Sequence, residues 1–333
     1  MQRLELLRQW LHGLYPGRDF TLAPASADAS FRRYFRVSFA IGEPLIVMDA
    51  PPEQEDCRPY LHVAELFSWA GAHVPTVLDK DLVQGFLLLS DLGQTTYLDA
   101  LKPDNARALY GDATATLVKI QLASRPGALP EYDRALLQRE LDLFPDWYLG
   151  RHLGVSLTDT QKNVLKAAFD HILAVNLAEP RVFVHRDYHS RNLMWLPDGA
   201  NPGVLDFQDA VLGPISYDLV SLFKDAYVAW EEEETLDWLI RYWEQARTAG
   251  LPVNADFAAF HRDYEFMGAQ RHIKVLGIFA RLFHRDGKDG YLKDMPLVMH
   301  YLRQTCDRYR ALGPLLKLLD EIEGKRAEVG YTF

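Results

Sequence analysis

The chain has few cysteines and lacks long apolar runs. Its 333 residues include only Cys57 and Cys306, which lie far apart and form no metal-type spacing. We therefore expect reduced thiols and a cytoplasmic setting, because disulfide-stabilised folds belong mainly to secreted proteins. The apolar runs are too short to span a bilayer, so we expect no membrane partner. The amphipathic start, MQRLELLRQWLHG, lacks the continuous apolar core of a signal peptide.

Blocks of basic residues are also missing. The formal net charge is −10, and no Lys/Arg-rich stretch occurs, so we expect no nucleic-acid partner. The strongest charge run is acidic, WEEEETLDW at residues 230–238. We interpret it as the first turn of a helix, where the helix dipole favours carboxylates. A metal or cation site is the alternative interpretation of this run.

The order of the sequence patterns predicts two lobes of different character. Helical spacing near the N-terminus precedes short apolar or alternating stretches, typical of strands, at residues 31–39, 44–51 and 85–93. Later patterns are long and helical, at residues 105–123, 134–150 and 159–176, followed by a strand-rich stretch at 181–208. We expect an α+β, bilobal architecture. A small β-rich N-terminal lobe would cover residues 1–92, and a larger, mainly helical lobe residues 93–333.

The strand-rich stretch carries the polar residues that favour phosphoryl transfer. Asn192 follows Asp187 by five residues, and Asp206 ends an apolar strand. Such a reaction requires charge neutralisation and a proton acceptor for the attacking hydroxyl. We predict Asp187 as that acceptor, and Asn192 and Asp206 as oxygen ligands of a nucleotide-bound magnesium ion. The alternative interpretation, without catalysis, is a polar turn between core strands in which both aspartates are surface caps.

Local spacing also predicts how these residues are brought together. The stretch LMWLPDGANPGV, residues 193–204, is typical of a hairpin that would place Asn192 and Asp206 at the same end of two neighbouring strands. We assign His185 a structural role in holding the loop. His189 either faces the acceptor or is a solvated loop residue.

Three motifs together resemble the aminoglycoside phosphotransferase family, a branch of the protein-kinase-like fold. They are VHRDYHSRN, VLDFQDAVLGPISYDLVSL and LLLSDLG, within a resemblance covering about residues 20–290. The resemblance implies an ATP- and Mg-dependent kinase acting on a small molecule. It implies that the backbone around Ser90, Asp91 and Leu92 binds the adenine, and that Asp218, at the start of a helix, ties down the catalytic loop.

Other stretches narrow the resemblance to a subgroup. SFRRYFRV, LIVMDAPP and RHIKVLGIFARL are similar to family members that phosphorylate the anomeric hydroxyl of cell-wall amino sugars. This implies a small amino sugar and a nucleotide as partners. Two alternatives stay open. The chain could act on another acceptor of the family, such as an aminoglycoside, choline, homoserine or thioribose, or it could be a nucleotide-binding regulator without catalysis.

Two parts expected of this family are absent. The turn at residues 24–35, PASADASFRRYF, has no glycine, and we expect Ser30 to approach the β-phosphate there. Met48 lies where a strand lysine is usual, which leaves Glu65, the expected partner on the next helix, without that lysine. Either an arginine, Arg33 or Arg36, supplies the charge, or magnesium does, or the chain is a pseudokinase.

The acceptor pocket is expected on two helical segments. Glu140, Asp142 and Tyr148 offer carboxylates and an aromatic face for a sugar, although the spacing of Leu141, Phe144 and Tyr148 also fits a core stripe. An acceptor with a carboxylate would require a nearby cation. The candidates are Arg191, Arg271 and Lys274. An aminoglycoside would instead require an acidic pocket.

Overall fold

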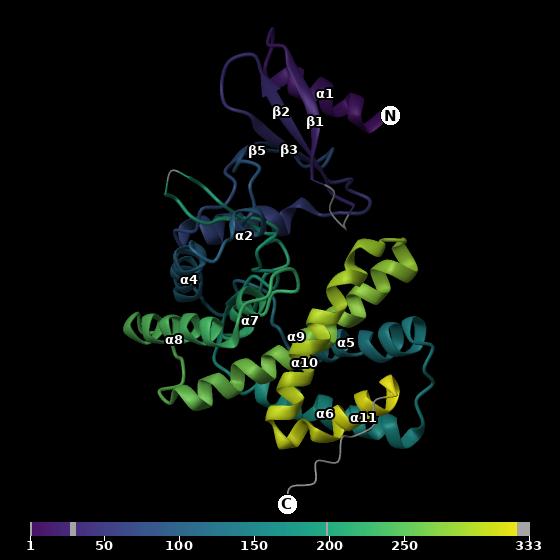
Figure 1. Cartoon of the computed structure of the whole chain (residues 1–333). Helices are drawn as coiled ribbons and strands as arrows, with labels where there is room; N and C mark the ends of the chain where they lie inside the picture. Colours follow the sequence, from purple (N-terminus) through teal and green to yellow (C-terminus); the bar gives the residue numbers. More distant parts are fainter. Residues whose placement is uncertain (1, 27–30, 198, 325–333) are drawn as a thin grey trace, which may run out of the picture. The chain divides into compact units, whose positions relative to one another are not determined.

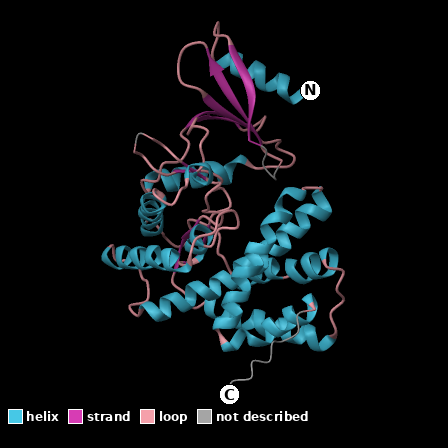
Figure 2. Ribbon diagram, viewed as in Figure 1, coloured by secondary structure: helices cyan, strands magenta, loops and turns pink. Residues whose placement is uncertain are grey.

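The computed structural model divides into two compact units and describes residues 2–26, 31–197 and 199–324. Unit 1 consists of Met1–Ile120 and Arg191–Asp209, and unit 2 consists of Gln121–Ser190 and Ala210–Phe333. Unit 1 contains most of the strands and unit 2 most of the helices, drawn in magenta and cyan in Figure 2. This distribution agrees with the α+β class that the sequence predicts.

Residues 191–209 are grouped with unit 1 because they form a hairpin that hydrogen-bonds there. Strand β7 (Leu193–Met194) pairs with β8 (Gly203–Val204) in an antiparallel ladder, which confirms the predicted hairpin. The Val204 N–H donates to the His73 carbonyl over 2.8 Å. The two compact units therefore have different bounds from the lobes expected at residues 1–92 and 93–333. Hydrogen bonds between residues far apart in the chain cannot be predicted from local sequence patterns.

The core of unit 1 is a five-stranded antiparallel sheet with strand order β1-β2-β3-β5-β4. Its strands are β1 (Phe20–Ser26), β2 (Arg33–Phe39), β3 (Leu45–Asp49), β4 (Val77–Asp81) and β5 (Phe86–Ser90). Strands β2, β3 and β5 lie within the three stretches that alternation and apolar runs predict. Met48 of β3 pairs with Tyr34 of β2 on one side and with Leu87 of β5 on the other.

Helix α1 (Gln2–Leu14) packs on one face of this sheet, and Figure 1 shows it beside β1 and β2. Its Leu7 and Leu11 are fully buried against Val37 and Val47. Successive strand residues point to opposite faces, so the odd-numbered residues of β2 and β3 face α1. The even-numbered residues of these strands therefore face away from α1.

Unit 1 has one helix between β3 and β4 in the chain and further helices after β5. Helix α2 (Cys57–Trp69) begins after Asp56, whose carboxylate accepts a hydrogen bond from the Arg58 N–H over 2.9 Å and so caps the helix. Helices α3 (Tyr97–Ala100) and α4 (Ala106–Leu122) come next.

Unit 2 is mainly helical. Its helices are α5 (Arg134–Leu141), the π-helical η1 (Phe144–His152), α6 (Asp159–Asn176), α7 (Tyr217–Phe223), α8 (Glu232–Thr248), α9 (Phe257–Asp286), the 3₁₀ segments η2 (Asp289–Asp294) and η3 (Arg310–Leu312), α10 (Met295–Arg308) and α11 (Gly313–Glu323). Its one described sheet pairs β6 (Arg181–Val184) with β9 (Val211–Pro214) in antiparallel fashion.

Helix α9 organises unit 2. It is 30 residues long and contacts η1, α6, α7 and α10, and Figure 1 shows it crossing the helical unit beside α10. Its buried residues cover several faces, as expected of a helix enclosed by others. Within the described ranges, none of the helices combines the length and apolar character that crossing a membrane requires.

The predicted helix at residues 134–150 is wrong as a single element. Helix α5 ends at Leu141, and η1 begins separately at Phe144. Pro145 lies in the first turn of η1. Proline has no N–H and clashes with the preceding helical turn, so it starts a helix more readily than it continues one.

Two glycines of α9 provide a matched test of its packing. A Cβ at Gly277 would lie 2.6 Å from the backbone carbon of Leu143, whereas a Cβ at Gly268 would meet nothing nearer than 3.6 Å. We expect Gly277→Ala to lower the free energy of unfolding by about 1–3 kcal/mol through overpacking. Gly268→Ala should be neutral or stabilising by up to about 1 kcal/mol, because alanine favours helix. Denaturant unfolding measures both, and equal effects would contradict this packing.

Candidate active site

The loop after β6 is held by one buried carboxylate in unit 2. Asp218, fully buried near the start of α7, accepts the N–H of His185 over 2.7 Å and the N–H of Arg186 over 3.0 Å. Arg186 has a φ of 77°, a left-handed conformation that is strained for a residue with a side chain. Burial raises the pKa of Asp218 to about 7, against the two N–H groups that favour its ionised form. The bonds fix the backbone immediately before Asp187.

His185 and His189 differ in their surroundings. The His185 side chain is buried, packs edge-on against Tyr188, and its Nδ1 accepts the Asp187 N–H over 3.2 Å. This environment suits the structural role expected of it. His189 is half-buried, with its ring against Tyr227 at a centroid distance of 5.4 Å.

The Asp187 carboxylate is partly exposed and lies among cations. Its Oδ1 is 3.6 Å from Nη1 of Arg271, and its side chain keeps 43% of its accessible surface. Although burial acts to raise it, Lys274 and Arg271 hold the pKa of Asp187 well below its ordinary value. The carboxylate is therefore ionised at neutral pH and can accept a hydrogen bond from a hydroxyl.

Arg271 and Lys274 are engaged within the protein. Arg271 donates to the Arg186 carbonyl over 2.7 Å and to the Tyr217 hydroxyl over 3.2 Å. Lys274 Nζ donates to the same hydroxyl over 2.8 Å. Both side chains are buried. The expectation that Arg271 meets a substrate carboxylate is thus disfavoured, because its donors already support the loop.

Glu140 was expected to bind a sugar hydroxyl, and its position contradicts this. It is 6% exposed, and its carboxylate accepts hydrogen bonds from Arg186 and from the Tyr132 hydroxyl. Lys274 Nζ lies 3.4 Å away. Although burial opposes it, Lys274 and Arg186 keep the pKa of Glu140 below its ordinary value. Glu140 therefore anchors the loop that carries Asp187, through the side chain of Arg186.

The other two residues predicted on this segment, Asp142 and Tyr148, lie in different surroundings. Asp142 is exposed and accepts a hydrogen bond from the Gln138 side chain over 2.7 Å. Tyr148 is buried and stacks on Phe144 at a centroid distance of 5.1 Å. Leu141 is also buried, so the core stripe, which the spacing left open, is the correct interpretation.

The predicted metal ligands lie together in unit 1. Asn192 Nδ2 is 3.4 Å from Asp206 Oδ2, and Gln208 Nε2 donates to Asp206 Oδ1 over 2.8 Å. The Leu205 N–H donates to the Asn192 carbonyl, a backbone hydrogen bond directly beside the β7–β8 ladder. Asp206 has a φ of 60°, an uncommon backbone conformation that sets the direction of its side chain.

This pair fits a magnesium ion by donor type. One amide oxygen and one carboxylate are hard oxygen donors, and magnesium keeps several waters and substrate phosphate oxygens in its own shell. Among the described residues no group of three or more His, Cys, Asp and Glu side chains forms a metal cage.

An arginine that approaches this pair is Arg32, which precedes β2. Its Nη2 lies 3.8 Å from Asp206 Oδ1, and only 11% of its side-chain surface is accessible. Burial, together with Tyr34 and Asp206, raises the pKa of Tyr60 on α2, and Arg32 opposes this rise. The Tyr60 ring lies against that of Phe207 at a centroid distance of 4.9 Å. We did not single out Arg32 from the sequence, although strand alternation places it with Tyr34 and Arg36, facing away from α1.

Arg33 and Arg36, the predicted substitutes for the missing lysine, have other partners. Arg33 Nε donates to Asp49 Oδ2 over 3.1 Å, and Arg3 of α1 binds the other oxygen of the same buried carboxylate. Arg33 therefore lies on the face that α1 covers, so its assignment is corrected. Arg36 forms a two-point ion pair with Asp91 and reaches the Gly93 carbonyl over 2.9 Å.

The remaining nucleotide-side predictions have mixed outcomes. Met48 is fully buried, and Glu65 is exposed on α2, so this glutamate is not placed to support a cation from β3. The Ser90 N–H donates to the Thr76 carbonyl, and the Ser90 Oγ accepts a hydrogen bond from the Thr76 N–H. The Asp91 carboxylate is engaged by Arg36, as described above.

Three further predicted residues remain to be located. Leu92 is buried, and Arg191 is exposed at the start of the hairpin segment. Ser30, expected to approach the β-phosphate, lies outside the described residues.

Curated relatives are similar over nearly the whole chain. The N-acetylmuramate/N-acetylglucosamine kinase of Neisseria meningitidis is 51% identical over 338 residues, covering 100% of both chains. The protein with the same name from Pseudomonas aeruginosa is 53% identical over 298 residues, which is 90% of this chain and 87% of that one.

Solved structures show the fold at much lower identity. Choline kinase LicA from Streptococcus pneumoniae superposes with a TM-score of 0.66 at 12% identity, covering 91% of this chain and 100% of that one. Aminoglycoside phosphotransferase APH(2'')-Ib gives a TM-score of 0.59 at 15% identity, covering 90% and 98%. The protein-kinase-like fold expected from the motifs is thereby confirmed.

The family assignment rests on a direct match. The model of the phosphotransferase enzyme family (APH) matches residues 21–257, which include the predicted base and both predicted metal ligands. The full-length relatives agree with it. The chain therefore belongs to the phosphotransferase enzyme family.

Proposed function

We propose that this phosphotransferase is an ATP- and Mg-dependent sugar kinase that phosphorylates the anomeric C1 hydroxyl of N-acetylmuramate and N-acetylglucosamine. The observation that carries the proposal is the 51% identity, over the whole chain, to a kinase named for these two sugars. The sugars are cell-wall components, so we place the reaction in cytoplasmic peptidoglycan recycling.

The residues of unit 2 suit the proton transfer. The C1 oxygen would form a bond to the γ-phosphorus of ATP while the bond to the ADP oxygen breaks. The hydroxyl proton passes to a carboxylate oxygen of Asp187, which is ionised and partly exposed. Arg271 and Lys274 keep it ionised, and Asp218 holds the backbone that precedes it.

The residues of unit 1 suit the nucleotide phosphates. Asn192 and Asp206 would hold magnesium, which neutralises phosphate charge when bound. Arg32 lies beside Asp206 and would add a second positive charge. It would replace the usual strand lysine, whose position is occupied by Met48. A guanidinium binds phosphate oxygens through two parallel N–H groups, so it suits this task.

The base is tested by Asp187→Asn. We expect kcat for N-acetylglucosamine to fall by about 10²–10⁴-fold, because the amide cannot accept the proton. ATP affinity, measured by calorimetry, should change little. Coupled ADP release gives the rates, and phosphorus NMR locates the product phosphate on C1. Asp142→Asn, an exposed carboxylate on the same unit, is the matched control. Wild-type turnover in the Asp187 variant would refute this role.

The cations around Asp187 are tested by the pH dependence of Lys274→Met. A lowered pKa means that wild-type Asp187 stays ionised, and active, far into the acid range. Without Lys274 the pKa of Asp187 should rise, so the acidic limb of kcat/KM should move up by about one pH unit or more. Lys166→Met on the surface of α6 is the control. An unmoved acidic limb in a folded Lys274 variant would contradict the electrostatic role.

The substitute cation is tested by Arg32→Ala. We expect kcat/KM for ATP to fall by about 10²-fold, with partial recovery in Arg32→Lys, and KM for the sugar to change little. Arg33→Ala should lower the melting temperature through Asp49 but leave kcat/KM for ATP near wild type. The opposite ranking of Arg32 and Arg33 would return the role to the residue predicted from the sequence.

A further inference from the structure

Arg281 of α9 carries a positive charge that no ion pair within the described residues neutralises. It is half-buried, and its Nε is buried without a hydrogen-bond partner there. A carboxylate close along the helix, Asp286, is already held by Arg285 through two hydrogen bonds of 2.7 and 2.8 Å. Burial, together with the like charge of Arg285, lowers the pKa of Arg281, and Asp286 opposes this. The guanidinium keeps its charge at neutral pH, because arginine is not deprotonated there.

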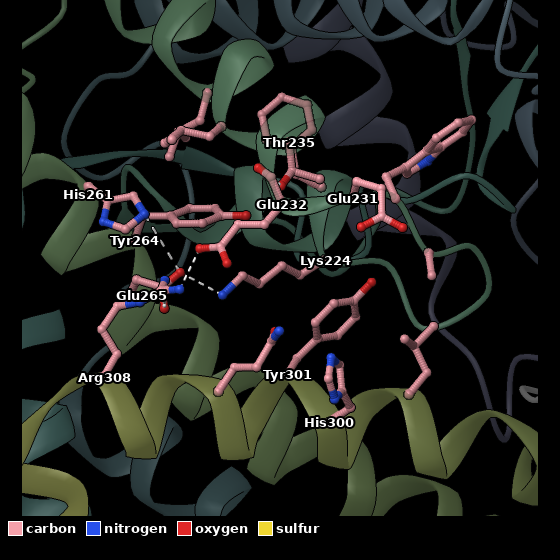
Figure 3. A pocket seen from close by; sticks show the side chains of 17 residues that line it. Lys224, Glu231, Glu232, Thr235, His261, Tyr264, Glu265, His300, Tyr301 and Arg308 are labelled. Carbon is pink, nitrogen blue, oxygen red and sulfur yellow. Dashed lines mark hydrogen bonds and ion pairs between the residues drawn. The ribbon is translucent and has the colours of Figure 1, made fainter. Parts of the chain in front are cut away.

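Two other cations of unit 2 are neutralised, in contrast to Arg281. Figure 3 shows Lys224 and Arg308 around Glu265, at a cavity of about 430 Å³. Lys224 Nζ lies 2.6 Å from the Glu265 carboxylate, and Arg308 Nη1 lies 3.1 Å from it. An anion in this cavity would have to displace Glu265. None of the described residues that line the cavity belongs to the loop that carries Asp187.

Arg281 lies on the same face of α9 as the cations around Asp187. It follows Lys274 by seven residues, which is two helical turns or about 10 Å along the axis. Residues seven apart in a helix point in nearly the same direction. Lys274 and Arg271 are the cations that hold the pKa of Asp187 low. Arg281 therefore extends, along one face of α9, the positive charge that begins at the proposed base.

This face of α9 becomes accessible beyond Lys274. Lys274 is buried, whereas Ile278 and Arg281, on the turns that follow, are half-buried. Leu276 and Ala280, on the opposite side of the helix at the same level, are fully buried. A ligand near Asp187 can therefore reach the apolar side chain of Ile278 and the guanidinium of Arg281.

The two sugars in the name of the curated relatives differ by one charged group. N-acetylmuramate carries a lactyl ether at C3 that ends in a carboxylate, whereas N-acetylglucosamine has a hydroxyl group at C3. A guanidinium binds a carboxylate through two parallel N–H groups. A half-buried guanidinium also keeps contact with water, so it tolerates a sugar that brings no carboxylate. One such residue would therefore allow both sugars and favour the acidic one.

We propose that Arg281 binds the lactyl carboxylate of N-acetylmuramate while the sugar ring lies against Ile278 and its C1 hydroxyl lies at Asp187. This role rests on the proposed sugar-kinase function and adds the residue that recognises the acidic acceptor. Arg271 and Lys274, which the sequence suggested for this task, donate instead to groups of unit 2 that support the loop.

The variant Arg281→Met tests this role with the two sugars as each other's control. Methionine keeps an unbranched side chain of similar length without the charge. We expect kcat/KM for N-acetylmuramate to fall by about 10- to 100-fold, since a hydrogen-bonded ion pair is lost. For N-acetylglucosamine, kcat/KM should stay within about twofold of wild type, since no charged partner is lost. Arg281→Lys, which keeps a point charge, should give an intermediate value for N-acetylmuramate.

A matched control lies on the same helix. Arg262 is exposed near the start of α9 and donates to the neighbouring Asp263 over 2.7 Å. Arg262→Met should match wild type with both sugars. The melting temperature of Arg281→Met should equal or exceed that of wild type, because no ion pair between described residues is broken. An arginine with a purely structural role would instead lower the melting temperature and affect both sugars alike.

The substrate can be changed in the same way as the protein. The amide of N-acetylmuramate has the same shape without the negative charge. Wild type should prefer the acid to the amide by about 10- to 100-fold, whereas Arg281→Met should use the two equally well. The two changes together should then cost no more than either alone, which is the sign of a direct interaction.

The outcomes separate this role from the proposed function. If wild type phosphorylates both sugars but Arg281→Met affects them equally or not at all, the carboxylate assignment is wrong and the sugar-kinase proposal stands. A selective loss of N-acetylmuramate activity in Arg191→Met, with Arg281→Met unchanged, would also overturn it and return the role to Arg191. A wild type that phosphorylates neither sugar would overturn both proposals.

Discussion

The bonds of Asp218 to the backbone of His185 and Arg186 are the constraint on which unit 2 depends. They hold Arg186 in a left-handed conformation that its side chain disfavours, and this turn presents Asp187 partly to solvent. The strain is tolerated because the Arg186 side chain is itself held by Glu140 and its carbonyl by Arg271. One buried carboxylate thus sets the backbone, and a second secures the side chain.

Many buried charged side chains of unit 2 form ion pairs with one another. Glu140, Lys274 and Arg271 form a buried set around the loop, and Glu265 joins Lys224 to Arg308 in another part of unit 2. A buried ion that lost its partner would cost several kcal/mol, about 3–5 for a broken buried pair, so each network constrains the positions of its members. The net charge of −10 says nothing about this arrangement, because the networks are locally balanced.

Much of the architecture could be predicted from local patterns. Alternation and apolar runs gave β2, β3 and β5, and the stretch between Asn192 and Asp206 gave the hairpin that brings these side chains within 3.4 Å. Partners of long side chains could not be predicted, because an arginine can reach several carboxylates. Arg33, Arg36 and Glu140 were therefore expected to face ligands, whereas they bind Asp49, Asp91 and Arg186.

The sequence by itself determined the family, the fold class and the types of chemical group on the loop that carries Asp187. These depend on motifs, that is, on residue types and their spacing along the chain. The tertiary structure decided which charged groups are already neutralised and which lie beside the predicted site. It placed Arg32, rather than Arg33, beside Asp206, because neighbouring residues of a strand point to opposite faces and α1 covers only one. It also placed residues of α7, α8, α9 and α10 around one cavity, which only packing between distant segments can do.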